Sequence, residues 1–201
     1  MNQTIFYYDK NAVDFCKNTI NADMSFCRDK FLKYLKDGAA ILDAGCGSGR
    51  DSVAFKQLGY QITAMDASPK ICREAEKELG QKVLCKNFEE INDVQTYDGI
   101  WACASLLHVP KEKMKGVLCR LKRALKDGGV LYASFKYGEE EKVVSGRLFY
   151  YYNEQSLRML MIENGFEVLE LFVTQDVRKG RREEKWVNVI GVKKENRRID
   201  L

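Results

Sequence analysis

A glycine-rich segment at residues 43–49 (Asp-Ala-Gly-Cys-Gly-Ser-Gly) carries the clearest chemical signal in the chain. It follows the apolar run at residues 40–42 and precedes a helical stretch that opens at Arg50. Glycines let the backbone turn tightly and let a ligand approach main-chain atoms. The following helix offers unpaired N–H groups and the positive end of its dipole. The segment therefore predicts a ligand-binding loop at the carboxyl end of a parallel strand.

The spacing of the glycines argues against a dinucleotide. A dinucleotide loop has the spacing G-x-G-x-x-G, whereas Arg50 occupies the position of the third glycine here. A long side chain there would obstruct a pyrophosphate, and Asp43 suits a cationic amino group better than a phosphate. Asp66, at the end of the next predicted strand, can accept protons from two ribose hydroxyls. Helix capping is the alternative role for Asp66, although Ser68 already fills the cap before Pro69.

These segments resemble the first two motifs of class I S-adenosylmethionine (SAM)-dependent methyltransferases. Residues 97–110 resemble the fourth motif of that class, and residues 125–131 resemble its turn into the fifth strand. The resemblance covers nearly the whole chain from Tyr7 onward. It is closest to the small bacterial branch that includes tellurite-resistance-type methyltransferases.

The resemblance implies SAM as the cofactor and S-adenosyl-L-homocysteine (SAH) as the product. Asp43 and the loop would hold the methionine part, and Asp66 would hold the ribose. The N-terminal segment would fold over the cofactor as a lid, with Tyr8 either touching SAM or packing in the core. The predicted cofactor-binding residues are Tyr8, Asp43, Gly45, Cys46, Gly47, Gly49, Asp66, Ala67, Ser68, Asn87, Phe88 and Ala102.

The methyl acceptor is less well defined by the sequence. His108 is the candidate catalytic residue, either as a general base or as a hydrogen-bond partner of the substrate, and the alternative is a packed histidine. The predicted substrate-binding residues are Lys136, Tyr137, Arg147 and Arg178. Together they would form a cationic, aromatic pocket for a carboxylate, phosphonate or phosphate; singly, each is typical of a surface residue.

The elements that position these residues alternate between apolar runs and amphipathic stretches. This pattern predicts an α/β fold, doubly wound and Rossmann-like, with a seven-stranded, mostly parallel sheet and helices on both faces. Strands are predicted at residues 40–44, 61–66, 82–85, 99–104, 130–135, 167–174 and 186–193. Helices are predicted at residues 11–18, 25–36, 50–58, 69–79, 111–125 and 154–163. About ten polar residues join the last two strands, too few for a crossover, so the last strand is predicted to be antiparallel.

The chain is predicted to be one methyltransferase domain over residues 1–201. Within it we expect an N-terminal helical lid at 1–38, a SAM-binding core at 39–135, and a substrate-side segment with a terminal β-hairpin at 136–201. No linker, repeat or low-complexity tract interrupts the sequence.

Composition narrows the classes of function. The chain has seven scattered cysteines and one histidine, which predicts no metal site. No apolar run spans a bilayer and no signal peptide is evident, so we expect a cytoplasmic protein with no membrane partner. The net charge is +4, with basic clusters at residues 178–182 and 193–198. A small-molecule methyltransferase acting on O, N or S is the leading hypothesis. An RNA (tRNA)-directed methyltransferase and an inactive SAM-binding sensor or partner subunit are the alternatives, and the oligomeric state stays open.

Overall fold

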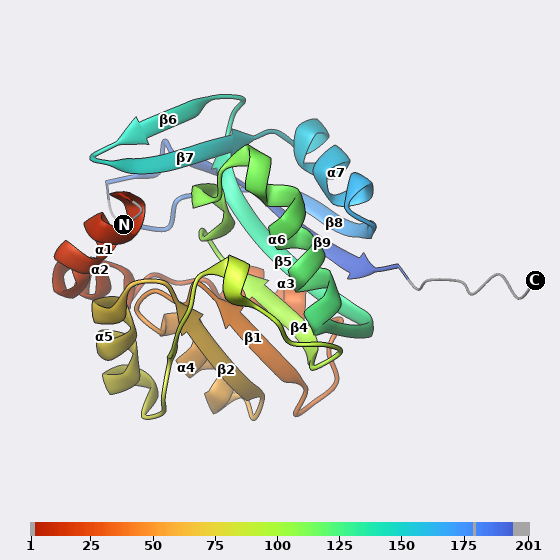
Figure 1. The fold of residues 1–201 in the computed structure, drawn as a ribbon, viewed down its shortest axis with the longest axis horizontal. Coiled ribbons are helices and arrows are strands. Elements are labelled where there is room, and N and C mark those ends of the chain that lie inside the picture. Colours follow the sequence, from red (N-terminus) through yellow and green to blue (C-terminus); the bar gives the residue numbers. More distant parts are fainter. Residues whose placement is uncertain (1–2, 179, 195–201) are drawn as a thin grey trace, which may run out of the picture.

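The computed structural model describes residues 3–178 and 180–194 and has a central sheet between two layers of helices (Figure 1). Five strands run parallel in the order β3-β2-β1-β4-β5. They are β1 (Ala40–Ala44), β2 (Gln61–Asp66), β3 (Leu84–Cys85), β4 (Tyr97–Ala102) and β5 (Leu125–Tyr137). The mostly parallel, Rossmann-like α/β sheet predicted from the sequence is thus confirmed.

Each face of the sheet is covered by its own helices because the strand side chains alternate in direction. Leu42 and Leu131 pack with the front helices in Figure 1, and Ile41 and Tyr132 pack with those behind. The front helices are α6 (Lys111–Ala124) and α7 (Glu154–Glu163), and those behind are α3 (Ser25–Leu32) and α4 (Arg50–Gln57). Helix α5 (Pro69–Leu79) stands at the left edge of the sheet in Figure 1 and packs against α4. Two short 3₁₀ turns, η1 (Phe88–Glu90) and η2 (Leu106–His108), follow β3 and β4.

The carboxyl-terminal strands close the sheet as an antiparallel hairpin. Strand β9 (Lys185–Lys193) pairs antiparallel with both β5 and β8 (Phe166–Gln175). The described residues that join the two strands, 176–178 and 180–184, contain no helix, and a short connection joins antiparallel neighbours. The predicted antiparallel last strand is confirmed. Of the predicted basic clusters, Lys179, Arg197 and Arg198 lie outside the described residues.

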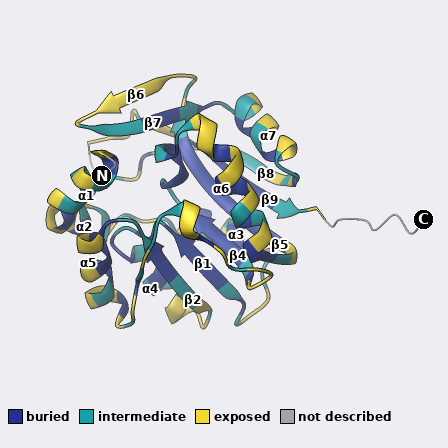
Figure 2. Ribbon diagram, in the orientation of Figure 1, coloured by how far each residue is buried: buried dark blue, intermediate teal, exposed yellow. Residues whose placement is uncertain are grey.

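The seven-strand prediction is wrong, because the described residues contain nine strands. The two additional strands form a hairpin of β6 (Glu141–Val144) and β7 (Arg147–Tyr152). Strand β7 pairs with the last two residues of β5, beyond the end of β4. Every residue of β6 is exposed (Figure 2), so β6 lacks the alternation by which a half-buried strand is recognised.

The amino-terminal segment contains two helices, α1 (Gln3–Lys10) and α2 (Ala12–Thr19), of which only the second was predicted. Asp9 fastens α1 to the start of α5: its Oδ1 accepts hydrogen bonds from Ser68 Oγ (3.0 Å) and from the backbone N–H of Lys70 (2.9 Å). Thr4, on the other side of α1, accepts a hydrogen bond from the backbone N–H of Leu148 in β7 (3.2 Å). Helix α1 therefore bridges α5 and the β6–β7 hairpin above the carboxyl edge of the sheet.

Several element boundaries also differ from the sequence prediction, among them the end of α3 at Leu32, and the largest difference lies between α6 and β5. Helix α6 ends at Ala124, and β5 begins at Leu125 rather than at residue 130. Leu125 pairs with Tyr97 of β4, and the backbone N–H of Thr96 donates to the Ala124 carbonyl (2.8 Å). This pairing with a distant strand overrides the helical tendency of the local sequence. None of the described helices is long and apolar enough to cross a membrane.

Candidate active site

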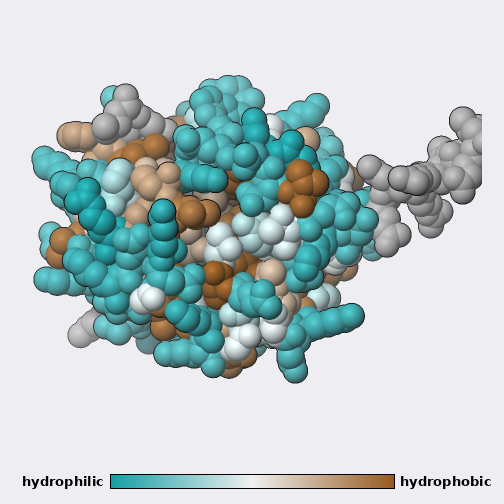
Figure 3. All heavy atoms as spheres, turned by 60° about the horizontal axis from the view of Figure 1, so that its bottom comes forward, coloured by the Kyte–Doolittle hydropathy of each residue, from teal (hydrophilic) through white to brown (hydrophobic). Residues whose placement is uncertain are grey.

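A cavity of about 850 Å³ opens at the carboxyl ends of β1, β2, β4 and β5, where doubly wound sheets bind ligands. Helix α1, the β6–β7 hairpin and the β8–β9 loop form its upper walls. Its volume lies in the upper part of the range of small-molecule sites, ~300–1,000 Å³. The opposite end of the sheet lies toward the face turned forward in Figure 3, where hydrophilic side chains predominate and hydrophobic ones form small groups. The cavity is therefore the main candidate for binding and chemistry.

The predicted loop after β1 forms one wall of the cavity. The N–H groups of Gly45 and Cys46 both donate to the Met65 carbonyl at the end of β2 (2.9 Å). Gly45 has a φ of +85°, and a Cβ there would lie 2.5 Å from the Cβ of Ser105. Glycine is therefore required at position 45 both by the backbone conformation and by the close approach of the segment after β4.

Asp43, at the end of β1, is buried beside this loop. Its Oδ2 accepts a hydrogen bond from Ser52 Oγ (2.6 Å). Burial, and secondarily the negative charge of Asp51, raises the pKa of Asp43 to about 7. A cationic group in the cavity would favour the charged form again.

Asp66, at the end of β2, faces the loop from the other side. Its two carboxylate oxygens accept backbone N–H groups from Gly47 (3.2 Å) and Ser68 (2.9 Å), and burial raises its pKa. These bonds hold the carboxylate in place while each oxygen keeps a further acceptor site. Ser68 caps α5 as predicted, accepting the N–H of Ile71 on its Oγ (3.3 Å). Capping by Ser68 leaves the Asp66 carboxylate available to a ligand.

Most of the predicted cofactor residues line this cavity together. They are Tyr8, Asp43, Gly45, Cys46, Gly47, Asp66, Ala67, Ser68, Asn87 and Phe88. Gly49 and Ala102 do not line it. Gly49 takes a left-handed conformation before α4 and faces Ala75 of α5, and Ala102 is fully buried in the core. Both positions were assigned from the spacing of the motif, which does not show on which side of the backbone the ligand lies.

A second charged cluster lies at the base of the cavity and was not anticipated from the sequence. Asp51 accepts hydrogen bonds from Arg28 Nη1 (2.7 Å), Arg50 Nη2 (2.6 Å) and the indole N–H of Trp101 (3.0 Å). Burial opposes the charge of Asp51, but the two guanidinium groups outweigh it, so the pKa of Asp51 is lowered. Trp101 in turn stacks on Tyr132 with ring centroids 3.9 Å apart. An acidic residue in the first turn of α4 was the available signal.

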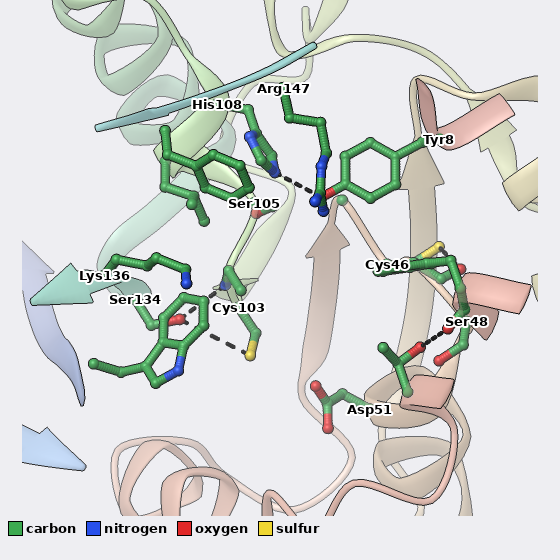
Figure 4. Close-up of a pocket in the computed structure, with 18 of the residues that line it drawn as sticks. Tyr8, Cys46, Ser48, Asp51, Cys103, Ser105, His108, Ser134, Lys136 and Arg147 are labelled. Atoms are coloured by element: carbon green, nitrogen blue, oxygen red, sulfur yellow. Dashed lines mark hydrogen bonds between the residues drawn. The ribbon is translucent and has the colours of Figure 1, made fainter. Parts of the chain in front are cut away.

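Tyr8, His108 and Arg147 meet at the other end of the cavity, opposite Asp51 (Figure 4). The Nδ1 of His108 lies 2.5 Å from the Leu148 carbonyl oxygen, which can only accept, so Nδ1 carries the proton. Nε2 therefore accepts a hydrogen bond from the Tyr8 hydroxyl (2.8 Å). Burial lowers the pKa of His108 to about 4, so the imidazole is neutral near pH 7.

The predicted substrate residues divide in the structure. Lys136, Arg147 and Arg178 line the cavity, whereas Tyr137 does not line it and is 39% exposed. A residue and its successor on a strand point to opposite faces, so Lys136 and Tyr137 at the end of β5 do not share a pocket. Tyr137 therefore does not share the pocket of the other three residues, and its role in substrate binding stays a prediction.

No group of three or more histidine, cysteine or acidic side chains with the arrangement of a metal site occurs in residues 3–178 and 180–194.

Comparison with known proteins places this fold and site beside methyltransferases. Residues 41–129, which are fewer than half of the chain, match the methyltransferase domain family.

Individual relatives show how far the likeness extends. The chain is 31% identical over 121 residues to a ribosomal protein L11 methyltransferase from Syntrophomonas wolfei, covering 57% of this chain and 38% of that protein. It is 32% identical over 104 residues to a ubiquinone biosynthesis O-methyltransferase from Xanthomonas oryzae, covering 48% and 43%. The chain thus matches less than half the length of either relative.

A solved structure matches over nearly the whole chain. It is the 1,6-didemethyltoxoflavin-N1-methyltransferase of Burkholderia thailandensis, with 1,6-didemethyltoxoflavin and SAH bound. The TM-score is 0.80 at 18% identity, over 96% of this chain and 88% of that one. At this identity the likeness shows the fold. These relatives support the methyltransferase class and not the narrower tellurite-resistance branch.

Proposed function

We propose that this protein binds SAM in the cavity and transfers its methyl group to a small-molecule nucleophile. The observation that carries the proposal is the pair of buried carboxylates, Asp43 and Asp66, on either side of a glycine loop at the ends of adjacent parallel strands. The names of the relatives refer to ribosomal protein L11, to O-methylation in ubiquinone biosynthesis and to N1-methylation of 1,6-didemethyltoxoflavin. They support methyl transfer without fixing the acceptor.

The residues on the glycine-loop side of the cavity suit the amino group, the ribose and the base of SAM. Asp43, whose pKa is raised to about 7 by burial, regains its charge beside an amino group. Asp66 keeps acceptor capacity for two hydroxyl protons of a ribose. Gly45 leaves main-chain atoms open to the ligand, and Asn87 and Phe88 offer a polar and an apolar surface to a base.

SAM supplies an electrophilic methyl group carried on a positively charged sulfur. The residues of the chain then have two tasks, which are to align the nucleophile with that methyl group and to keep water out. Helix α1 and the β6–β7 hairpin cover the cavity for the second task. An acceptor with a high pKa must also lose a proton.

His108 was predicted to be either the general base that removes this proton or a hydrogen-bond partner of the substrate. The geometry favours the hydrogen-bonding role for His108. Its free lone pair is taken by the Tyr8 hydroxyl, and a pKa of about 4 makes the imidazole a weak base. We expect His108 to orient the hydroxyl of Tyr8 toward the cavity. The Tyr8 oxygen can then accept a hydrogen bond from the molecule that receives the methyl group.

The charges around the cavity favour a small acceptor over RNA. Arg178 is paired with Asp176 and Arg181 with Glu184, so much of the described basic cluster is neutralised locally. An RNA-binding surface needs cations that are free to contact phosphates. Methylation of tRNA with a steep salt dependence would overturn the small-molecule proposal. Tight SAM binding without turnover would favour the sensor.

Isothermal titration calorimetry with SAH tests the donor half of the proposal. Asp66→Ala should weaken SAH binding at least about tenfold, because charge-assisted hydrogen bonds to the ribose are lost. Glu163→Gln, on the exposed side of α7, is the matched control and should bind as the wild type does. A change of less than about threefold in Asp66→Ala would contradict the cofactor assignment. A coupled assay for SAH release over a panel of O, N and S nucleophiles then tests turnover.

A further inference from the structure

Most of the basic residues that line the cavity form ion pairs with acidic side chains, and one does not. They are Arg50, Lys113, Lys136, Arg147, Arg178 and Arg181. Five form ion pairs, Arg50 with Asp51, Lys113 with Glu89, Lys136 and Arg181 with Glu184, and Arg178 with Asp176. Within the part of the chain that the structure describes, Arg147 has no acidic partner. Its positive charge is therefore available to a ligand.

Aromatic rings surround the Arg147 guanidinium. Its Cζ lies 4.1 Å from the ring centroid of Tyr7, 5.1 Å from that of Phe149 and 5.7 Å from that of Tyr8. The buried Nε has no hydrogen-bond partner in the structure. Aromatic faces attract a guanidinium without satisfying its N–H groups. The guanidinium also donates a hydrogen bond to the Tyr8 hydroxyl. It is thus held in place by these groups, and no carboxylate of the described residues takes its remaining N–H groups.

The guanidinium of Arg147 presents a planar fork of N–H groups. Such a fork matches two oxygens of a carboxylate or a phosphate, with two parallel hydrogen bonds. Because solvent does not reach the Nε, a ligand in the cavity would pair with the two terminal Nη groups. A carboxylate carries a single negative charge, which matches the one guanidinium that has no acidic partner.

The rest of this end of the cavity fits a flat organic body. Phe149 and Trp186 line the cavity, and the Lys136 ammonium lies 5.7 Å from the ring centroid of each. Aromatic side chains bind flat rings by stacking or edge contacts. An inorganic oxyanion would make no use of these surfaces. The aromatic walls therefore distinguish an organic acid from a simple ion.

We propose that the methyl acceptor is an aromatic carboxylic acid whose carboxylate is bound by Arg147, with its ring against the aromatic side chains of Phe149 and Trp186. This inference rests on the proposed function and names the substrate class for the same cavity. Arg147 acts as a specificity-determining residue, and the Tyr8 hydroxyl beside it lines the same cavity.

Calorimetry on SAH-saturated protein at physiological salt tests the inference. The probes are 4-hydroxybenzoate, 3,4-dihydroxybenzoate and indole-3-carboxylate, each compared with its amide, which keeps the ring and removes the charge. The wild type should bind at least one acid about tenfold or more tightly than its amide. Arg147→Gln should abolish that preference, and Arg147→Lys, which keeps the charge without the fork, should retain only part of it. Lys142→Gln, exposed on the same hairpin and outside the cavity, should retain all of it.

Several results would overturn the inference while leaving the proposed function intact. These are binding of SAH without binding of any acid, equal binding of acid and amide, and displacement of the acid by orthophosphate at equal concentration. If Arg147→Gln weakens SAH binding itself by the same factor, Arg147 holds the donor and not the acceptor. Failure of the wild type to bind SAH would instead overturn the proposed function. Should Arg147→Gln fail to fold, the acid–amide comparison on wild type and Arg147→Lys still decides the matter.

Discussion

The carboxylate of Asp43 is buried without a cation in direct contact. This burial allows a quantitative prediction of how the stability of the protein depends on pH. Burial raises its pKa from 3.8 to about 7. A folded-state pKa above the unfolded value means that the folded protein holds the proton more tightly, so stability falls as the pH rises through this range. At about 1.4 kcal/mol per pKa unit, the charged form costs the ligand-free protein about 4 kcal/mol at pH 8.

Asp43→Asn removes this cost and keeps an oxygen for the Ser52 hydroxyl. We expect the ligand-free variant to be more stable than the wild type, with the difference in free energy of unfolding growing by about 2–3 kcal/mol between pH 5 and pH 8. The same variant should bind SAH at least about tenfold more weakly, since the amide offers no charge to the amino group. Urea unfolding at both pH values, with and without SAH, measures both effects.

Asp98 provides a control of opposite sign. Burial opposes its charge, but Lys126 and the backbone N–H of Ala40 lower its pKa overall, and it lies outside the cavity. Asp98→Asn should therefore lose stability at pH 8 and leave SAH binding unchanged. If Asp43→Asn has the same pH dependence of stability as the wild type, the reasoning about the buried carboxylate is refuted.

Three further predictions concern the loop, the lid and the imidazole. Gly45→Ala should lower the free energy of unfolding by at least about 1–3 kcal/mol, because φ is +85° and a Cβ would meet Ser105, and calorimetry should show loss of SAH binding. Asp9→Ala should raise amide hydrogen exchange in α1 by about tenfold, because two hydrogen bonds to α5 are lost; unchanged exchange would contradict that attachment. Burial lowers the pKa of His108 in the folded protein from 6.5 to about 4. The contribution of the neutral imidazole to stability is therefore complete above pH 6.5 and is lost as the pH falls toward 4. His108→Asn should reduce the loss in free energy of unfolding between pH 7 and pH 5 by about 2 kcal/mol, measured by urea unfolding.

The donor half of the molecule was predictable because its signals are local. Ser68 and Pro69 mark the start of α5, and the predicted bounds of β1, β2, α5 and α7 agree with the structure. The glycine loop and Asp66 meet because parallel strands end at the same edge of a sheet. Spacing alone could not show that Gly49 faces α5 and not the cavity.

The acceptor half depends on contacts between distant segments, which the sequence does not display. The ion pair of Lys136 joins β5 to the β8–β9 loop, and only the folded chain reveals that Arg147 has no such partner. The sequence of the β6–β7 hairpin does contain one feature that is typical of a hairpin. Ser145 and Gly146 both have positive φ (53° and 77°), as in a two-residue type I′ turn, and a Ser-Gly pair between short runs rich in valine and aromatic residues is compatible with one.

The attachment of the β6–β7 hairpin separates two properties of the protein. It joins the parallel sheet through two residue pairs, Lys136 with Tyr151 and Tyr137 with Tyr152, beyond the point where β4 ends. The register of β1, β4 and the rest of β5, which sets the donor loop, does not pass through these pairs. Under the proposed function, substitutions of Arg147 and Phe149 would therefore change the acceptor wall while the register of β1 and β4 that sets the glycine loop stays the same. Changes at Leu148 would also reach Tyr8 through His108.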